Sequence, residues 1–389
     1  MKNLLKQLPI QILLVVVIAI VFTPFLSKDI LRIFYSISCL FKDALMIFLP
    51  ILVFSYMFSS MMKFAKSAPM LIFAILITVT LSNVAAFGIS FYLCKFFMSF
   101  LDLTSGIDLT TQTDSIESLT ALPIPGFWAP KNSMIAGLIL GIIFSFVNNK
   151  KIDQFSNTLK GFVTNIFNGY FIPALPLFIF GFFVKLQYEG AIKSLFLGYG
   201  KVLIVVMPIY ISYFLILFLL ANKFSFSDTM KHIKDSSTAF LTGFSTTSSL
   251  AAMPLMFKTA EKHTASKDYV EFMIPSTINI HAIGDGLIFA ATAAATIYLF
   301  DGTFPTFPAF MVFLYYYGLA KFSTAAVPAG SALVLTPLVV SYFGFSYKMS
   351  AIFLTLGILQ DCIETAGNVL GNIWYVKFSY NLFGKKILK

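Results

Sequence analysis

The last long apolar run of the sequence carries five polar side chains that could bind a solute or a cation. They are Asp361, Glu364, Thr365, Asn368 and Asn372. Spacings of three and four residues place them along one stripe of a helix. An acid at the centre of a membrane helix costs roughly 3 kcal/mol on insertion scales, so two acids within one turn require a cavity or a partner. Hydrogen bonds between helices explain Thr365 and Asn372 more readily than they explain the acid pair.

A second polar cluster interrupts the apolar span 272–298. It contains Asn279, His281 and Asp285, the last of which lies between two glycines. Such a cluster indicates local unwinding of the helix, with ion coordination or proton handling as its chemistry. A lone buried histidine is more often structural, and only the nearby Asp285 makes His281 a candidate.

Two further segments place small polar residues in the middle of apolar runs. Segment 239–256 contains Thr247, Ser248 and Ser249 before Pro254. Backbone that leaves helical geometry inside a membrane is tolerated only where it is buried in protein or lines a cavity. We therefore predict a re-entrant hairpin. A continuous helix whose hydroxyls bond to the preceding turn is the alternative.

Segment 310–343 repeats this pattern. Its central residues include Thr324, Ala326, Val327 and Pro328. Lys321 lies beside them and either reaches the membrane surface or pairs with an acid. Each of the two segments is followed by a long apolar span that holds a threonine and an asparagine close together. A hairpin followed by a helix, twice over, indicates an inverted-repeat transporter with its site near the middle of the membrane.

Six apolar stretches precede these segments and would position the site. They are 10–26, 43–62, 69–98, 133–147, 159–186 and 202–221. Of the 389 residues, 58% are apolar and 11% are charged, which is about half the charge of a soluble domain. The sequence therefore predicts an all-α polytopic membrane protein with eight transmembrane helices and two re-entrant helical hairpins. The first stretch lacks a small-residue cleavage site and is predicted to be an uncleaved helix.

The charged residues between the spans predict the orientation. Lys63, Lys66 and Lys150 flank spans on one side, whereas the loop 102–131 is acidic. The positive-inside rule then predicts cytoplasmic N- and C-termini and a multi-pass protein of the inner (plasma) membrane. The net charge of +10 is distributed over short caps, so no nucleic-acid partner is predicted. The three cysteines have no metal-like spacing, and we expect neither a metal centre nor an organic cofactor.

The polar stripe resembles the last helix of the dicarboxylate/amino acid:cation symporters, the family of the glutamate transporters. That helix typically reads Asp-x-x-Arg-Thr-x-x-Asn-Val-x-Gly-Asp, and residues 361–372 match five of the seven defined positions. Ser248 and Ser249 resemble part of the family's serine-rich hairpin, and 323–331 resembles its Gly-Thr-Ala-Gly-Val-Pro-Gly gate. The motifs cover about 237–378, and the earlier part is similar only in its pattern of spans.

The resemblance implies a glutamate-transporter-like homotrimer in the lipid bilayer, in which a transport domain moves past a static scaffold. It places the scaffold spans, together with spans three and six, in 1–230, the core of the transport domain in 231–380 and a cytoplasmic tail in 381–389. The implied solute contacts are Thr247, Ser248, Ser249, Ala326, Val327, Pro328, Asp361, Glu364, Thr365 and Asn368. The candidate cation or proton contacts, taken from the polar cluster and the resemblance together, are Asn279, His281, Asp285, Thr324, Asn368 and Asn372.

Several positions depart from the family pattern. Glu364 replaces the arginine that pairs with an acidic solute, and Thr247 stands where many prokaryotic members have another arginine. The sodium motif Asn-Met-Asp-Gly-Thr is absent, and Asn372 replaces a sodium-binding aspartate. These departures predict repulsion of acidic solutes and favour proton coupling through Glu364, Asp361 or His281 as an alternative to sodium.

We therefore predict a secondary-active symporter, not an enzyme, that takes neutral or cationic amino acids together with H⁺ or Na⁺. A standard glutamate, aspartate or dicarboxylate symporter is one alternative. An uncoupled, channel-like member of the family is another. An intramembrane hydrolase using Ser248 or Ser249 with His281 and Asp285 is disfavoured, because the hydroxyl run has no nucleophile-elbow glycines.

Overall fold

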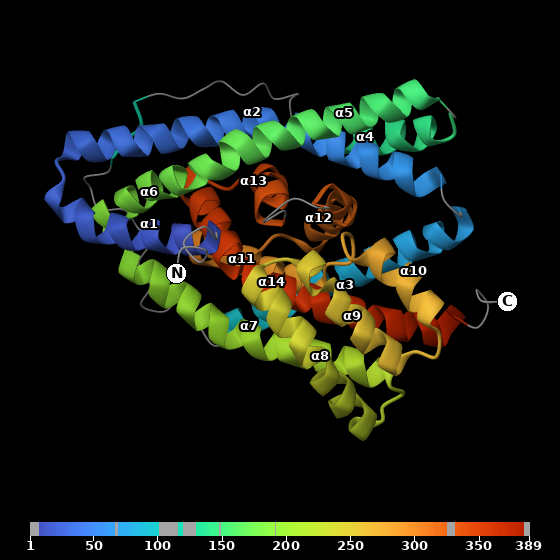
Figure 1. Ribbon diagram of the computed structural model, residues 1–389. Helices are drawn as coiled ribbons and strands as arrows, with labels where there is room; N and C mark the ends of the chain where they lie inside the picture. The colour runs from blue at the N-terminus through green and yellow to red at the C-terminus, as the bar shows by residue number, and fades with distance from the viewer. Residues whose placement is uncertain are drawn as a thin grey trace.

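The protein is described by a computed structural model that covers residues 8–66, 69–100, 116–119, 130–147, 149–190, 192–324 and 331–384. Within these ranges every regular element is a helix (Figure 1). The acidic loop predicted for 102–131 falls largely outside the described residues. Ala326, Val327 and Pro328, and the end of the predicted tail, also lie outside them.

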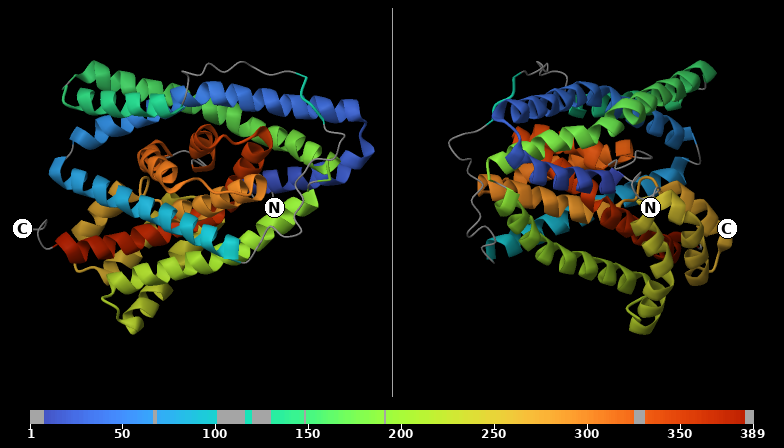
Figure 2. Two further views of the ribbon diagram at one scale, coloured as in Figure 1. Left: turned by 180° about the vertical axis from the view of Figure 1, so that it is seen from behind. Right: turned by 60° about the vertical axis from the view of Figure 1, so that its left-hand side comes forward.

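Apolar runs in the first half of the chain form long helices. These elements are α1 (Leu8–Phe22), the 3-10 turn η1 (Thr23–Phe25), α2 (Lys28–Lys66), α3 (Pro69–Phe100), α4 (Pro130–Ser145), α5 (Lys150–Ile166), the π-helical turn η2 (Phe167–Phe171), α6 (Ile172–Tyr188) and α7 (Ile192–Ala221). Helices α2, α4 and α5 form one layer, at the top of Figure 1 and in both views of Figure 2. Helices α2 and α4 approach closely at Gly141, where a Cβ would lie only 2.7 Å from Met61 Cβ.

Shorter and interrupted helices make up the second half. They are α8 (Phe226–Thr246), α9 (Ser249–His263), α10 (Lys267–Thr277), α11 (Ile283–Asp301), α12 (Phe307–Ala320), the 3-10 turn η3 (Lys321–Thr324), the π-helical turn η4 (Ser331–Leu335), α13 (Thr336–Phe343), α14 (Tyr347–Ser379) and the π-helical turn η5 (Tyr380–Gly384). Helix α14 packs against α11, α8 and α9 and lies in the middle of the molecule (Figure 1). The breaks in these helices therefore lie around a long central helix.

The crossing of α11 and α14 depends on two glycines. A Cβ on Gly284 would overlap the carbonyl oxygen of Glu364 and lie 2.8 Å from the backbone nitrogen of Asn368. A Cβ on Gly367 would lie 2.6 Å from the Cα of Gly284. The two backbones can come this close because neither residue has a side chain at the contact. This contact brings the first turn of α11 next to the polar stripe of α14.

Five helices among the described residues are long and apolar enough to cross a membrane. They are Ala74–Phe100, Lys150–Tyr188, Tyr199–Ala221, Ile283–Asp301 and Lys348–Leu382. The shorter apolar helices are Ile10–Phe25, Pro50–Ser59, Ile135–Ser145 and Ser331–Phe343. Large apolar side chains on the outer helices are exposed, and Ile204 on α7 is 75% accessible. Such an exterior fits a hydrocarbon environment.

Two helices extend beyond the apolar stretches that predict them. Helix α2 runs over Lys28–Lys66, whereas the predicted span was 43–62. The helical stretch that includes α5 begins at Lys150, whereas its predicted span began at 159. Hydropathy reports which part of a helix is apolar, but backbone hydrogen bonds continue through the adjoining polar residues. The apolar length is therefore a lower bound for the helix.

Candidate functional site

Asp285, in the first turn of α11, is the centre of the candidate site. The side chain is buried, and its Oδ2 atom forms an ion pair of 2.6 Å with the Lys321 ammonium. The Ser331 hydroxyl donates to the same oxygen. The Asn368 amide donates to Oδ1 over 2.5 Å. One carboxylate thus connects α11 with α14 and with the segments on both sides of 325–330.

Both polar atoms of the Asn368 side chain are used in holding Asp285. Its amide nitrogen donates to the carboxylate, and its amide oxygen accepts from the backbone N–H of Asp285 over 3.2 Å. The pair of bonds fixes the orientation of the amide and clamps α14 to the start of α11. Asn368 therefore positions the carboxylate.

Two more carboxylates lie beside this centre, on the stripe of α14. Glu364 is 1% exposed, and its Oε1 atom has no hydrogen-bond partner among the described residues. Asp361 is half-buried, and its charged neighbours are Asp285 and Lys321. The charged neighbours of Glu364 are Asp285, Asp361 and Lys321. Three carboxylates thus share the region with one ammonium among the described residues.

This imbalance defines what the site can bind. Buried charges of like sign repel strongly and are stable only when partners or protons neutralise them. One lysine can balance one of the three carboxylates. Protons, a metal cation or the ammonium group of a solute can balance the others. The site is therefore suited to cationic groups and unsuited to a further acidic side chain.

The other candidates of the cation set lie apart from the carboxylates. Asn279 is exposed at the break between α10 and α11. His281 is fully buried, and its Nε2 atom lies 2.9 Å from the Ser82 hydroxyl on α3. The Asn372 amide donates to the carbonyl oxygen of His281 over 2.9 Å. These contacts hold the break in place, whereas Thr324 lies next to the centre and donates to the carbonyl oxygen of Lys321.

The hydroxyl-rich turn between α8 and α9 has local hydrogen bonds. Thr247 adopts a left-handed conformation with φ of 49°, which reverses the chain between the two helices. The Ser248 hydroxyl accepts from the backbone N–H of Ala251 and caps α9. The side chains of Thr247, Ser248 and Ser249 are half-exposed. Thr365 is buried on α14.

Lys321 and Ser331 complete the site, although neither was assigned to it from the sequence. The sequence left two alternatives for Lys321, a position at the membrane surface and a pairing with an acid, and an unpaired ammonium inside the membrane is costly. The sequence did not identify the partner among three acids. The fold does so by placing the ammonium 2.6 Å from Asp285 Oδ2 and 2.9 Å from the Ser331 hydroxyl, which itself donates to that carboxylate oxygen.

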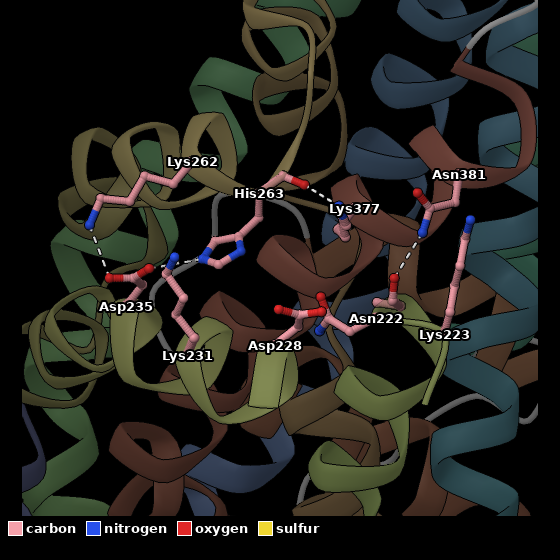
Figure 3. Close-up of a pocket in the computed structure, with 10 residues that line it drawn as sticks. Asn222, Lys223, Asp228, Lys231, Asp235, Lys262, His263, Lys377 and Asn381 are labelled. Carbon is pink, nitrogen blue, oxygen red and sulfur yellow. Dashed lines mark hydrogen bonds and ion pairs between the residues drawn. The ribbon is translucent and has the colours of Figure 1, made fainter. Parts of the chain in front are cut away.

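A separate pocket lies where the ends of α7 and α14 meet α8 and α9 (Figure 3). It has a volume of about 800 Å³ and shares no lining residue with the carboxylate site. Asp235 forms an ion pair of 3.0 Å with Lys262 and a hydrogen bond of 3.0 Å with His263 Nε2. The His263 ring stacks on His232 with the ring centroids 3.9 Å apart.

The pKa values of the two histidines in this region, His232 and His263, are lowered. Burial, and then the neighbouring charges of His263 and Lys377, lower the pKa of His232 to about 3. Burial also lowers the pKa of His263, although the bond with Asp235 opposes this shift. The bond from Lys262 lowers the pKa of Asp235. The pair is therefore neutral near pH 7, and the pocket is lined by four lysines and two aspartates.

Comparison with known proteins agrees with this architecture. Residues 8–378 match the model of the sodium:dicarboxylate symporter family. The serine/threonine transporter SstT of Campylobacter jejuni strain 81-176 is 26% identical over 393 aligned positions, which cover 94% of this chain and 92% of the relative. SstT of C. jejuni subsp. doylei is 27% identical over 367 positions, which cover 88% and 87%. The chain is thus a transporter rather than an enzyme, and it belongs to the sodium:dicarboxylate symporter family.

Proposed function

We propose that this protein is a secondary-active symporter of small neutral amino acids, with serine and threonine as the first solutes to test, coupled to H⁺ or Na⁺. The observation that carries the proposal is the group of three carboxylates around one lysine at the contact of α11 and α14. Such a site can hold a solute ammonium together with a coupling cation. The names of the curated relatives support the choice of serine and threonine.

In this proposal Asp361 receives the ammonium group of the solute. It is the most accessible of the three carboxylates and has no hydrogen-bond partner among the described residues. Glu364 takes up the coupling proton, because its buried Oε1 atom has no donor in the described part of the chain. Asp285 stays paired with Lys321 and keeps α11, α14 and the segment after α12 in register.

Acidic amino acids are expected to be poor solutes. An acidic amino acid would bring a side-chain carboxylate, in addition to its α-carboxylate, to a site that already holds three carboxylates and one ammonium among the described residues. At the two positions where the family has arginines, this protein has Glu364 and Thr247, so neither arginine is present to pair with an acidic solute. A cationic amino acid is the second candidate, because Glu364 could receive its side chain instead of a proton.

For transport we propose alternating access of the elevator type. Helices α8, α9, α11 and α14 would move as one body, since α14 packs against the other three. Helices α2, α4 and α5, which form a separate layer, would belong to the static scaffold. In this scheme the α8–α9 pair and the segment around 321–335 act as re-entrant hairpins on the two sides of the site, within a homotrimer.

The test is uptake into proteoliposomes that contain the purified protein. Serine, threonine, aspartate, glutamate and lysine are offered in turn under an inward Na⁺ gradient, an inward H⁺ gradient or neither. The proposal expects gradient-dependent accumulation of serine and threonine and little accumulation of aspartate. Accumulation of aspartate or glutamate alone would overturn the solute assignment. A solute-dependent current without accumulation would overturn symport in favour of an uncoupled, channel-like activity.

A further inference from the structure

Lys321 lies at an unusual position for an ammonium group. It directly follows α12, it is 1% exposed, and aromatic and small apolar residues precede and follow it. Its Nζ atom lies 2.6 Å from Asp285 Oδ2 and 2.9 Å from the Ser331 hydroxyl. A charged lysine in such a place needs the carboxylate, and the carboxylate needs the lysine.

The oxygens around this ammonium resemble the ligands of a monovalent cation. A carboxylate oxygen from α11 and a hydroxyl oxygen from η4 both contact the ammonium, and Asn368 on α14 orients that carboxylate by donating to its other oxygen. Hard oxygens of these types also bind small metal cations. The Nζ atom thus occupies a place where a free cation would receive the same charge compensation.

We propose that the Lys321 ammonium is a built-in cation that takes the place of one coupling ion. The inference rests on the proposed symport function and specifies how one positive charge of that site is supplied. A free coupling ion enters with the solute and leaves on the other side of the membrane. The lysine stays attached, neutralises Asp285 in every state and returns with the empty carrier, so it contributes no net charge to the cycle.

A purely structural ion pair would behave differently when the lysine is removed. In that case Lys321→Ser leaves Asp285 without a partner, and small cations have no special effect. If the ammonium replaces a coupling ion, the same change opens a space next to two oxygens that a sodium ion can fill. The variant should then gain a dependence on Na⁺ that the unmodified protein lacks at this position.

The experiment measures the melting temperature of the purified full-length protein in detergent, without solute. NaCl is compared with N-methylglucamine chloride at equal ionic strength, because the organic cation is too large for the vacated space. A bound ion raises the melting temperature of the folded state by mass action. We expect a Na⁺-dependent rise for Lys321→Ser that is larger than any rise for the unmodified protein. The double variant Lys321→Ser with Asp285→Asn should lose the additional rise.

The control is Lys267→Ser. Lys267 also pairs with a carboxylate, Glu271, but both side chains are more than half exposed. Its removal should add no Na⁺ effect. If Lys321→Ser does not yield folded protein, Lys321→Gln replaces it, because the amide is closer in size to the lysine and still removes the charge. An equal Na⁺ effect in the variant and the unmodified protein would overturn the inference.

A second readout separates this inference from the proposed function. Serine binding to Lys321→Ser should be weakened at least about tenfold without Na⁺ and restored by Na⁺. If serine binds neither protein but the additional Na⁺ effect appears, the solute assignment fails and the built-in cation stands. If serine binds the unmodified protein and the additional Na⁺ effect is absent, the solute assignment stands and the built-in cation fails.

Discussion

At the scale of single residues, the three carboxylates of the site differ in how their charge is satisfied. Asp285 has an ammonium, a hydroxyl and an amide as partners. Glu364 is more deeply buried and leaves one oxygen without a donor among the described residues. Asp361 is half-buried. These surroundings suit three roles: a fixed anchor, a group that gains and loses a proton, and a contact for the solute.

Replacing Glu364 by glutamine tests the proton role. The amide has nearly the shape of the acid but cannot carry a proton through the cycle, so accumulation of serine driven by a pH gradient should be abolished. Exchange of internal for external serine needs no net proton movement and should persist. Both are measured in proteoliposomes, with the exposed Glu271→Gln as the control. If pH-driven accumulation survives in Glu364→Gln, Glu364 is not the proton carrier, and a change of preference away from cationic solutes would assign it to the solute instead.

Replacing Asp361 by asparagine tests the solute contact. The amide cannot form an ion pair with the solute ammonium, and the loss of a buried charged partner should weaken serine binding about 100-fold or more. The melting temperature without solute should change little, because Asp361 has no hydrogen-bond partner among the described residues. Isothermal titration with serine measures the affinity, and the exposed Asp268→Asn serves as the control. Unchanged affinity would remove Asp361 from the solute site.

At the scale of elements, the carboxylate site depends on how closely α11 and α14 approach. Replacing Gly284 by alanine would force the new methyl group into the Glu364 carbonyl oxygen and towards the Asn368 backbone. We expect a loss of about 3 kcal/mol in stability and a fall in the melting temperature. Gly161→Ala is the matched control, because no heavy atom lies within 4 Å of its Cβ position in the helix α5. A normal melting temperature for Gly284→Ala would mean that the crossing can widen without cost.

The sequence predicted the elements better than it predicted their contacts. Apolar runs located the long helices, and the polar residues near Asp285 predicted the break that separates α10 from α11. Helical spacing predicted the stripe of α14, because that spacing is local. For Lys321 the sequence left open whether it reaches the membrane surface or pairs with an acid, because the pairing with Asp285 depends on how η3 lies against α11. His281 shows the same limit, since its partner Ser82 lies 199 residues away in the chain.

At the scale of the whole molecule, the two clusters of charged residues described above differ in exposure. The carboxylate site is enclosed between central helices, whereas the pocket of Figure 3 lies where the ends of α7, α9 and α14 meet the first half of α8. In that pocket Asp235 joins α8 to the end of α9, and the Lys377 ammonium donates to the carbonyl oxygen of His263. The pocket region therefore holds the α8–α9 pair to α14 and should influence the stability of the whole bundle.

The buried histidine of that region makes global stability depend on pH. His232 is 0% exposed and has a pKa of about 3, against an ordinary value of 6.5 in the unfolded chain. Below about pH 6.5, His232 becomes protonated in the unfolded chain but stays neutral in the folded protein. The free energy of unfolding should therefore fall by about 1.4 kcal/mol for each pH unit below that value. His263 adds to this loss, because its pKa is also lowered.

His232→Gln removes this titration and should flatten the fall of the melting temperature between pH 6.5 and 5. At pH 7.5 the variant should be less stable than the unmodified protein, since it loses the stacking of His232 on His263. At pH 5 the difference should shrink or reverse, because only the unmodified protein has a histidine here that is protonated in the unfolded state and neutral in the folded state. Melting curves in detergent at four pH values measure the effect. Parallel curves for the two proteins would mean that the His232 ring does not stay neutral in the folded state and that other groups set the pH dependence.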